Sequence, residues 1–128
     1  MEKQPKILLI DDDIDFVEAT KTVLESNNYN VIIAHEGEEG LRKAREETPD
    51  LVLLDIIMPV KNGFTAAEQF KKDTKLSHIP VIMLTSFSSK GAGSGIPLSG
   101  GLTLETEDYV EKPVSPELLI SKVKQYIG

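Results

Sequence analysis

Five short apolar runs, separated by longer and more polar segments, restrict the fold of this chain more than any other feature. The runs are Ile7–Ile10, Val31–Ala34, Leu51–Leu54, Val81–Leu84 and the weaker Tyr109–Val110. The first, third and fourth are apolar at every position and do not alternate with polar residues. Strands have this character when helices cover both faces of a parallel sheet. The runs therefore predict a buried parallel β-sheet.

Most segments between the runs have the length and periodicity of helices. Apolar residues recur at helical spacing from Ile14 to about Ser26, directly after Asp13, which is a suitable N-cap. Three further helices are expected over Glu38–Glu47, around Phe64, Ala67 and Phe70, and from Ser115 and Pro116 onward. Strands that alternate with helices predict a three-layer, doubly wound α/β domain whose crossovers are right-handed.

One segment departs from this alternation. Where a fourth helix is due, glycines stand at positions 91, 93, 95, 100 and 101, and Pro97 lies among them. The combined helix penalties of glycine and proline make a long regular helix unfavourable. We expect an irregular Gly-rich segment over residues 88–101, with a helical turn or two near Leu102–Thr106.

Composition narrows the class of protein. With 128 residues, 40% hydrophobic and 27% charged, residues 1–128 are expected to form a single globular domain. The net charge of -7 disfavours direct contact with a nucleic-acid backbone. There is no cysteine, and the apolar run after MEKQPK is too short for a signal peptide or a membrane span. We expect a cytoplasmic protein without membrane contact of its own.

Charged and hydroxyl side chains gather at the ends of the predicted strands. In an open parallel α/β sheet, ligands bind beyond the carboxyl ends of the strands, so these side chains are expected to meet at one edge. Asp13 more simply caps the first helix, and the two histidines are expected at the surface. The remaining residues in these positions are Asp11, Asp12, Asp55, Thr85 and Lys112.

The charge balance of this group predicts its ligand. Three carboxylates crowded near one lysine leave about two negative charges, which a divalent cation would neutralise. Every candidate ligand atom is an oxygen, and that favours magnesium over zinc. Such a site suits phosphoryl chemistry. Asp55 would be the nucleophile, Lys112 and the cation would stabilise charge on the transferring group, and Thr85 would donate a hydrogen bond to it.

These residues stand in motifs that resemble those of CheY-like receiver domains of two-component response regulators. The motifs are ILLIDDD, LVLLDIIMP with the phosphoacceptor, the NG pair that follows, VIMLTS and DYVEKP, in the family's order over nearly the whole chain. The resemblance implies a five-stranded sheet of order 2-1-3-4-5. It also implies phosphoryl transfer from the phosphohistidine of a sensor histidine kinase, or from a phosphotransfer protein, to Asp55.

The resemblance further implies roles for individual residues. Asp12, Asp55 and the backbone carbonyl of Ile57 would bind the magnesium ion directly, and Asp11 mostly through water. Thr85 and Tyr109 would form a switch pair that reports phosphorylation to a downstream protein effector. The Lys112–Pro113 peptide would be cis, which is uncommon even before proline. A receiver of this kind catalyses only its own phosphorylation and dephosphorylation.

Three other interpretations remain open. A magnesium-dependent phosphatase would also form an aspartyl phosphate, but it would be expected to carry a second acid two residues after its nucleophile, where Ile57 stands. A pseudo-receiver would keep the fold and work without phosphate, and the altered fourth-helix region keeps this interpretation open. A flavodoxin-type cofactor binder would need a phosphate-binding loop after the first strand, where this chain has acids that would repel the ligand.

Overall fold

A parallel sheet forms the centre of the molecule. The computed structural model describes residues 4–55, 63–85, 108–112 and 115–127. The strands of the sheet are all parallel, in the order β2-β1-β3-β4-β5. Their bounds are β1 Lys6–Ile10, β2 Asn30–Ala34, β3 Leu51–Asp55, β4 Val81–Thr85 and β5 Asp108–Glu111. The predicted parallel α/β fold is confirmed, and each strand is slightly longer than its apolar run.

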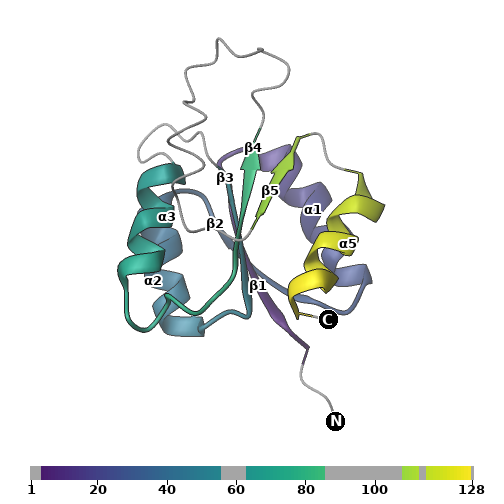
Figure 1. Ribbon diagram of the computed structural model, residues 1–128. Helices are drawn as coiled ribbons and strands as arrows, with labels where there is room; N and C mark the ends of the chain where they lie inside the picture. Colours follow the sequence, from purple (N-terminus) through teal and green to yellow (C-terminus); the bar gives the residue numbers. More distant parts are fainter. Residues whose placement is uncertain (1–3, 56–62, 86–107, 113–114, 128) are drawn as a thin grey trace.

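Helices cover both faces of this sheet, as the uninterrupted apolar runs required. Figure 1 shows α2 and α3 on one face and α1 and α5 on the other. Among the described residues, no helix has both the length and the apolar character needed to cross a membrane. The bounds of the helices are α1 Ile14–Ser26, α2 Gly37–Glu47, α3 Gly63–Lys72 and α5 Pro116–Ile127.

Each face of the sheet has its own hydrophobic core. Leu8 and Ile10 of β1 pack with the buried side chains of α2 and α3, whereas Ile7 and Leu9 pack with those of α1 and α5. Successive side chains of a strand point to opposite faces, so a strand between two helical layers must be apolar at every position. This is the physical reason for the continuous apolar run in β1.

Local signals fix the ends of the helices. Asp13 is the N-cap of α1, and its side chain accepts a hydrogen bond from the backbone N–H of Phe16. Asn27 ends the helix, and Asn28 follows with a left-handed backbone (φ 71°), a conformation that asparagine tolerates well. At the end of α2, Thr48 adopts the left-handed conformation with φ 45°. The predicted capping role of Asp13 is confirmed.

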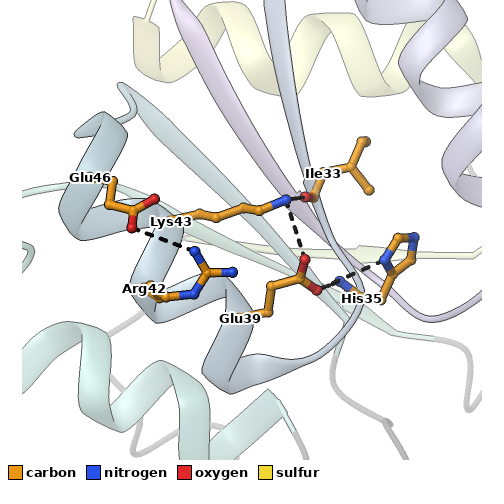
Figure 2. Close-up of polar contacts among 6 residues, drawn as sticks. All are labelled: Ile33, His35, Glu39, Arg42, Lys43 and Glu46. Carbon is orange, nitrogen blue, oxygen red and sulfur yellow. Dashed lines mark hydrogen bonds and ion pairs between the residues drawn. The ribbon is translucent and has the colours of Figure 1, made fainter.

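The start of α2 is tied to the edge strand β2 by a polar network. Glu39 accepts a hydrogen bond from the backbone N–H of His35 at 2.8 Å and forms an ion pair with Lys43 at 3.2 Å. Lys43 also donates to the backbone carbonyl of Ile33 in β2 at 2.6 Å, as Figure 2 shows. The ion pair between Arg42 and Glu46 is exposed, whereas Lys43 is bound to the edge of the sheet.

Several predicted features fall outside the described residues. These are the Gly-rich segment over residues 88–101 with the turns expected at Leu102–Thr106, and the peptide bond between Lys112 and Pro113. They stay predictions.

Candidate phosphoacceptor site

The parallel register of β1 and β3 brings two acids together. Ile10 pairs with Leu54, and Asp11 and Asp55 are the residues that follow these partners. Asp55 itself still pairs with Leu84 of β4, so it is held inside the sheet at the last position of β3. The backbone N–H of Asp11 donates to the carbonyl of Ala34 in β2 at 3.0 Å. Pairing with β4 thus fixes the backbone of Asp55, and the hydrogen bond to β2 fixes the backbone of Asp11.

Asp12 completes a cluster with these two carboxylates. One oxygen from each of Asp11, Asp12 and Asp55 can be chosen so that all three lie within 4.8 Å of one another. Asp11 and Asp55 are buried and Asp12 is exposed, so the cluster is open to solvent on one side. Asp13 is not part of the cluster, which agrees with its role as the N-cap of α1.

Lys112 brings a positive charge to the buried side of the cluster. Its Nζ lies 2.7 Å from Oδ2 of Asp11 and 3.7 Å from Oδ1 of Asp55, and only 14% of its side chain is exposed. The lysine directly follows β5, at the far edge of the sheet from β2. The acids and the lysine that the sequence placed at strand ends are therefore neighbours.

This donor set fits a hard divalent cation. No described residue donates a directed hydrogen bond to Oδ2 of Asp11, although this atom is fully buried and Lys112 lies close to it. One lysine cannot balance three carboxylates, and two charges 4.8 Å apart still repel by about 3 kcal/mol at an effective dielectric constant near 20. All the ligand atoms are carboxylate oxygens, which magnesium prefers.

One aromatic contact to this cluster was missed by the sequence analysis. Nζ of Lys112 lies 4.3 Å from the centre of the Phe16 ring. The helical spacing of Phe16 predicted only a core residue of the first helix, and the ring does pack against the core cluster between the sheet, α1 and α5. A single sequence carries no signal for the contact between Phe16 and Lys112, because this contact depends on where the lysine lies after β5 has joined the sheet.

Other predicted site residues are described only in part. Thr85 ends β4 and Tyr109 lies in β5, but their side chains lie outside the described part of the structure, as does the whole of Ile57. The backbone register places Thr85 opposite Glu111, one residue before Lys112. The hydroxyl and aromatic switch roles stay predictions.

Fold and cluster together define a class: a doubly wound α/β domain with an oxygen-rich acidic site at the carboxyl edge of its sheet. Residues 7–124 match the family described as the response regulator receiver domain. The chain belongs to this family, the receiver domains of two-component response regulators.

Curated relatives agree with this assignment. The chain is 35% identical over 125 residues to the polar-differentiation response regulator DivK of Brucella anthropi, and the match covers 97% of this chain and 98% of that protein. It is 36% identical over 124 residues to the "Probable transcriptional regulator ycf27" of Guillardia theta. That match covers 97% of this chain but only 46% of the relative, so the chain spans about half the length of that protein.

Solved structures share the fold. A CheY-like receiver domain protein from Methanospirillum hungatei is 30% identical, with a TM-score of 0.83 and coverage of 96% of this chain and 93% of that one. The receiver domain of a sensor histidine kinase from Pseudomonas aeruginosa is 25% identical, with a TM-score of 0.86 and coverage of 98% and 99%. Its structure contains a magnesium ion coordinated in the active-site cleft.

Proposed function

We propose that residues 1–128 form a single receiver domain that accepts a phosphoryl group on Asp55 and thereby changes its affinity for a downstream protein. The observation that carries this proposal is the position of Asp55, which is buried at the end of β3, clusters with Asp11 and Asp12, and lies 3.7 Å from Nζ of Lys112. Family membership supports the same chemistry.

The buried carboxylate of Asp55 is suited to act as a nucleophile. In the proposed reaction, a bond forms between one Asp55 oxygen and phosphorus while the phosphorus–nitrogen bond of a phosphohistidine breaks. The histidine nitrogen of the donor keeps the electron pair of that bond. A sensor histidine kinase or a phosphotransfer protein would supply the phosphohistidine, and the fixed place of Asp55 in the sheet reduces the entropic cost of reaching the reactive geometry.

Lys112 is suited to stabilise charge on the group in transfer. Its Nζ lies between Asp11 and Asp55, so a phosphoryl oxygen attached to Asp55 would find an ammonium donor close by. The Thr85 hydroxyl would donate a hydrogen bond to a second phosphoryl oxygen. Thr85 and Tyr109 would together form the switch pair that reports phosphorylation to a downstream protein. These two roles extend the family's pattern to this chain.

Asp11, Asp12 and Asp55, together with the backbone carbonyl of Ile57, are the residues assigned to hold a magnesium ion. Asp12 and Asp55 would bind it directly and Asp11 mostly through water. When bound, the ion would offset the negative charge that the phosphate brings to the carboxylates. The solvent-exposed position of Asp12 leaves one side of the cluster accessible to the cation and to a phosphodonor.

Phosphorylation by a small donor tests this function directly. The chain is incubated with acetyl phosphate and magnesium, and intact mass is recorded. We expect the mass of one added phosphoryl group, its absence in Asp55→Asn, and its absence in wild type after magnesium is removed with a chelator.

Asp13→Asn is the matched control for this experiment. It removes a charge from the same acidic run but keeps the N-cap of α1, because asparagine caps helices as well as aspartate does. We expect it to be phosphorylated like wild type. An adduct that persists in Asp55→Asn would contradict the assignment of Asp55. A wild-type chain that stays unmodified would contradict the function and favour a phosphate-independent pseudo-receiver.

A further inference from the structure

The surroundings of Lys112 differ on its two sides. Toward the sheet, its Nζ faces Oδ2 of Asp11 at 2.7 Å and Oδ1 of Asp55 at 3.7 Å. Toward helix α1, the same atom faces the ring of Phe16 at 4.3 Å from the ring centre. Carboxylates and an aromatic face thus share one ammonium group.

The aromatic contact restricts the position of the Lys112 ammonium group. A lysine side chain has four rotatable carbon segments and a strongly hydrated ammonium, so a single carboxylate contact fixes it poorly. The negative face of an aromatic ring attracts the cation, and the ring also excludes water from that side. Phe16 therefore adds a second direction of attraction and narrows the positions available to Nζ.

Phe16 is itself held in place from two sides. It lies in the first turn of α1, and its backbone N–H donates to Oδ1 of the N-cap Asp13 at 3.2 Å. Its half-buried ring packs against the core cluster that α1 and α5 form with the sheet. The third acid of the run DDD thus anchors the helix turn that carries the ring.

We propose that Phe16 is a positioning residue for Lys112: its ring holds the ammonium group at the place where a phosphoryl group on Asp55 would need it. This inference rests on the proposed function for its consequence. Its structural part, the cation–π contact, stands on the geometry alone. Phe16 acts through the lysine and does not itself contact the reacting atoms.

The contact is tested first without any phosphoryl chemistry. In NMR spectra, the ring current of Phe16 should shift the Lys112 Cε protons upfield in wild type and in Phe16→Tyr, and the shift should disappear in Phe16→Leu. Lys112 Cε resonances at the positions of ordinary exposed lysines in wild type would overturn the inference, whatever the fate of the proposed function.

The consequence is tested with beryllium trifluoride, a mimic of the bound phosphoryl group, in the presence of magnesium. Phe16→Leu is expected to weaken its binding by about threefold to tenfold, the range that a partly exposed cation–π contact predicts. Phe16→Tyr, which keeps the aromatic face, should bind it as wild type does. Equal binding by wild type and Phe16→Leu would overturn the proposal.

A double-mutant comparison separates positioning from general packing. In a Lys112→Met background, Phe16→Leu should have no further effect, because the group on which the ring acts is gone. Val23→Ala, which trims another residue of α1 against the same core cluster, is the matched control and should lower stability without weakening beryllofluoride binding. A Phe16→Leu effect that persists without the lysine would show that the ring acts by packing and would refute the proposal.

Magnesium binding to the unphosphorylated chain provides the last readout. Phe16→Leu should leave the magnesium dissociation constant unchanged, since the ring contacts the lysine and not the assigned ligands. A parallel loss of magnesium affinity would mean that the whole acidic cluster has moved, and would equally refute a specific effect on Lys112.

Discussion

Asp11 is a carboxylate whose burial costs free energy of folding, although it forms part of the acidic cluster. Its carboxylate is fully buried, and within the described part of the chain it contacts the ammonium of Lys112 at Oδ2 and the backbone N–H of Asp13 at Oδ1, 2.9 Å away. A buried charge is costly unless ion pairs and hydrogen bonds offset the lost hydration. Among the described residues, Oδ2 has the ion pair with Lys112 but no directed hydrogen bond, so the charge of the lysine is what offsets its lost hydration.

Glu39 offers a residue-scale prediction that concerns pH. The backbone N–H of His35 lowers the pKa of Glu39 below its ordinary value of 4.5, and the nearby Lys43 adds to this effect. A carboxylate with a lowered folded-state pKa contributes stability above its unfolded pKa, and that contribution is lost as the pH falls through the folded pKa. We expect Glu39→Gln to reduce the free energy of unfolding by about 1 kcal/mol at neutral pH.

Urea unfolding at a series of pH values measures this effect. The difference between wild type and Glu39→Gln should shrink as the pH falls from above 4.5 through the folded-state pKa of Glu39. Glu46→Gln, on the same helix in an exposed ion pair with Arg42, is the control and should change stability little at any pH. A difference that stayed constant down to acidic pH would show that the carboxylate charge is not what matters.

At the scale of residues, the sequence predicted which residues form the site better than it predicted which residues contact one another. Asp11, Asp12, Asp55 and Lys112 were each placed at a strand end, and the structure brings them together because parallel strands end at one edge. The Phe16 contact could not be predicted, since residues 16 and 112 meet only through the packing of α1 beside β5. The capping role of Asp13 needed only local spacing.

At the scale of secondary-structure elements, Gly40 allows α2 and β1 to approach each other closely. A Cβ atom at this position would lie 2.3 Å from Cδ1 and 2.8 Å from Cγ1 of Ile10. Rotation of the terminal methyl group alone cannot relieve both contacts. The glycine therefore lets the helix lie against the strand that carries Asp11 at its end.

Gly40→Ala tests this packing. Overpacking costs about 1–3 kcal/mol, whereas alanine gains up to about 1 kcal/mol in helix propensity over glycine, so the steric cost should prevail. We expect a net loss of about 1 kcal/mol in the free energy of unfolding, measured by urea denaturation. Adding Ile10→Val should recover part of this loss, because it removes the Cδ1 atom that the new Cβ would meet.

This experiment is decided by the coupling energy between the substitutions Gly40→Ala and Ile10→Val. The stability of the double variant should exceed the value expected from adding the two single effects. Strict additivity would mean that α2 shifts as a unit away from the sheet, and that Ile10 does not define the distance between them.

The elements themselves were largely predictable, and their ends less so. β1, β3 and β4 were evident from continuous apolar runs, and each gained a residue because backbone pairing continues past the apolar side chains. β5 was the weakest prediction, with only Tyr109–Val110 apolar, since an edge strand needs less buried surface. The start of α2 at Gly37 was missed by one residue, because Glu36 is an unusual N-cap.

For the whole molecule, the acidic cluster predicts a link between cation binding and folding stability. A ligand that binds only the folded state adds about 2.7 kcal/mol at a concentration of one hundred times its dissociation constant. For a chain of this length, that corresponds to a rise in Tm of roughly 10 °C. We expect magnesium to produce such a rise in thermal unfolding of wild type.

Two comparisons make the effect specific. Sodium chloride at the same ionic strength should raise Tm much less, although it screens the net charge of -7. Asp12→Asn should reduce the magnesium effect, because it removes one of the three clustered carboxylates. An equal rise with both salts would indicate general screening and would count against a cation site at this cluster.

The order of the strands determines when a growing chain can assemble the acidic cluster and its lysine. The charged groups of the site come from the first, middle and last portions of the sequence, and adjacent strands of a parallel sheet are joined only through long crossovers. No fragment that lacks either terminal portion would contain a complete phosphoacceptor. On the proposed function, a newly made chain would accept a phosphoryl group only after β5 has joined the sheet and brought Lys112 to the acidic cluster.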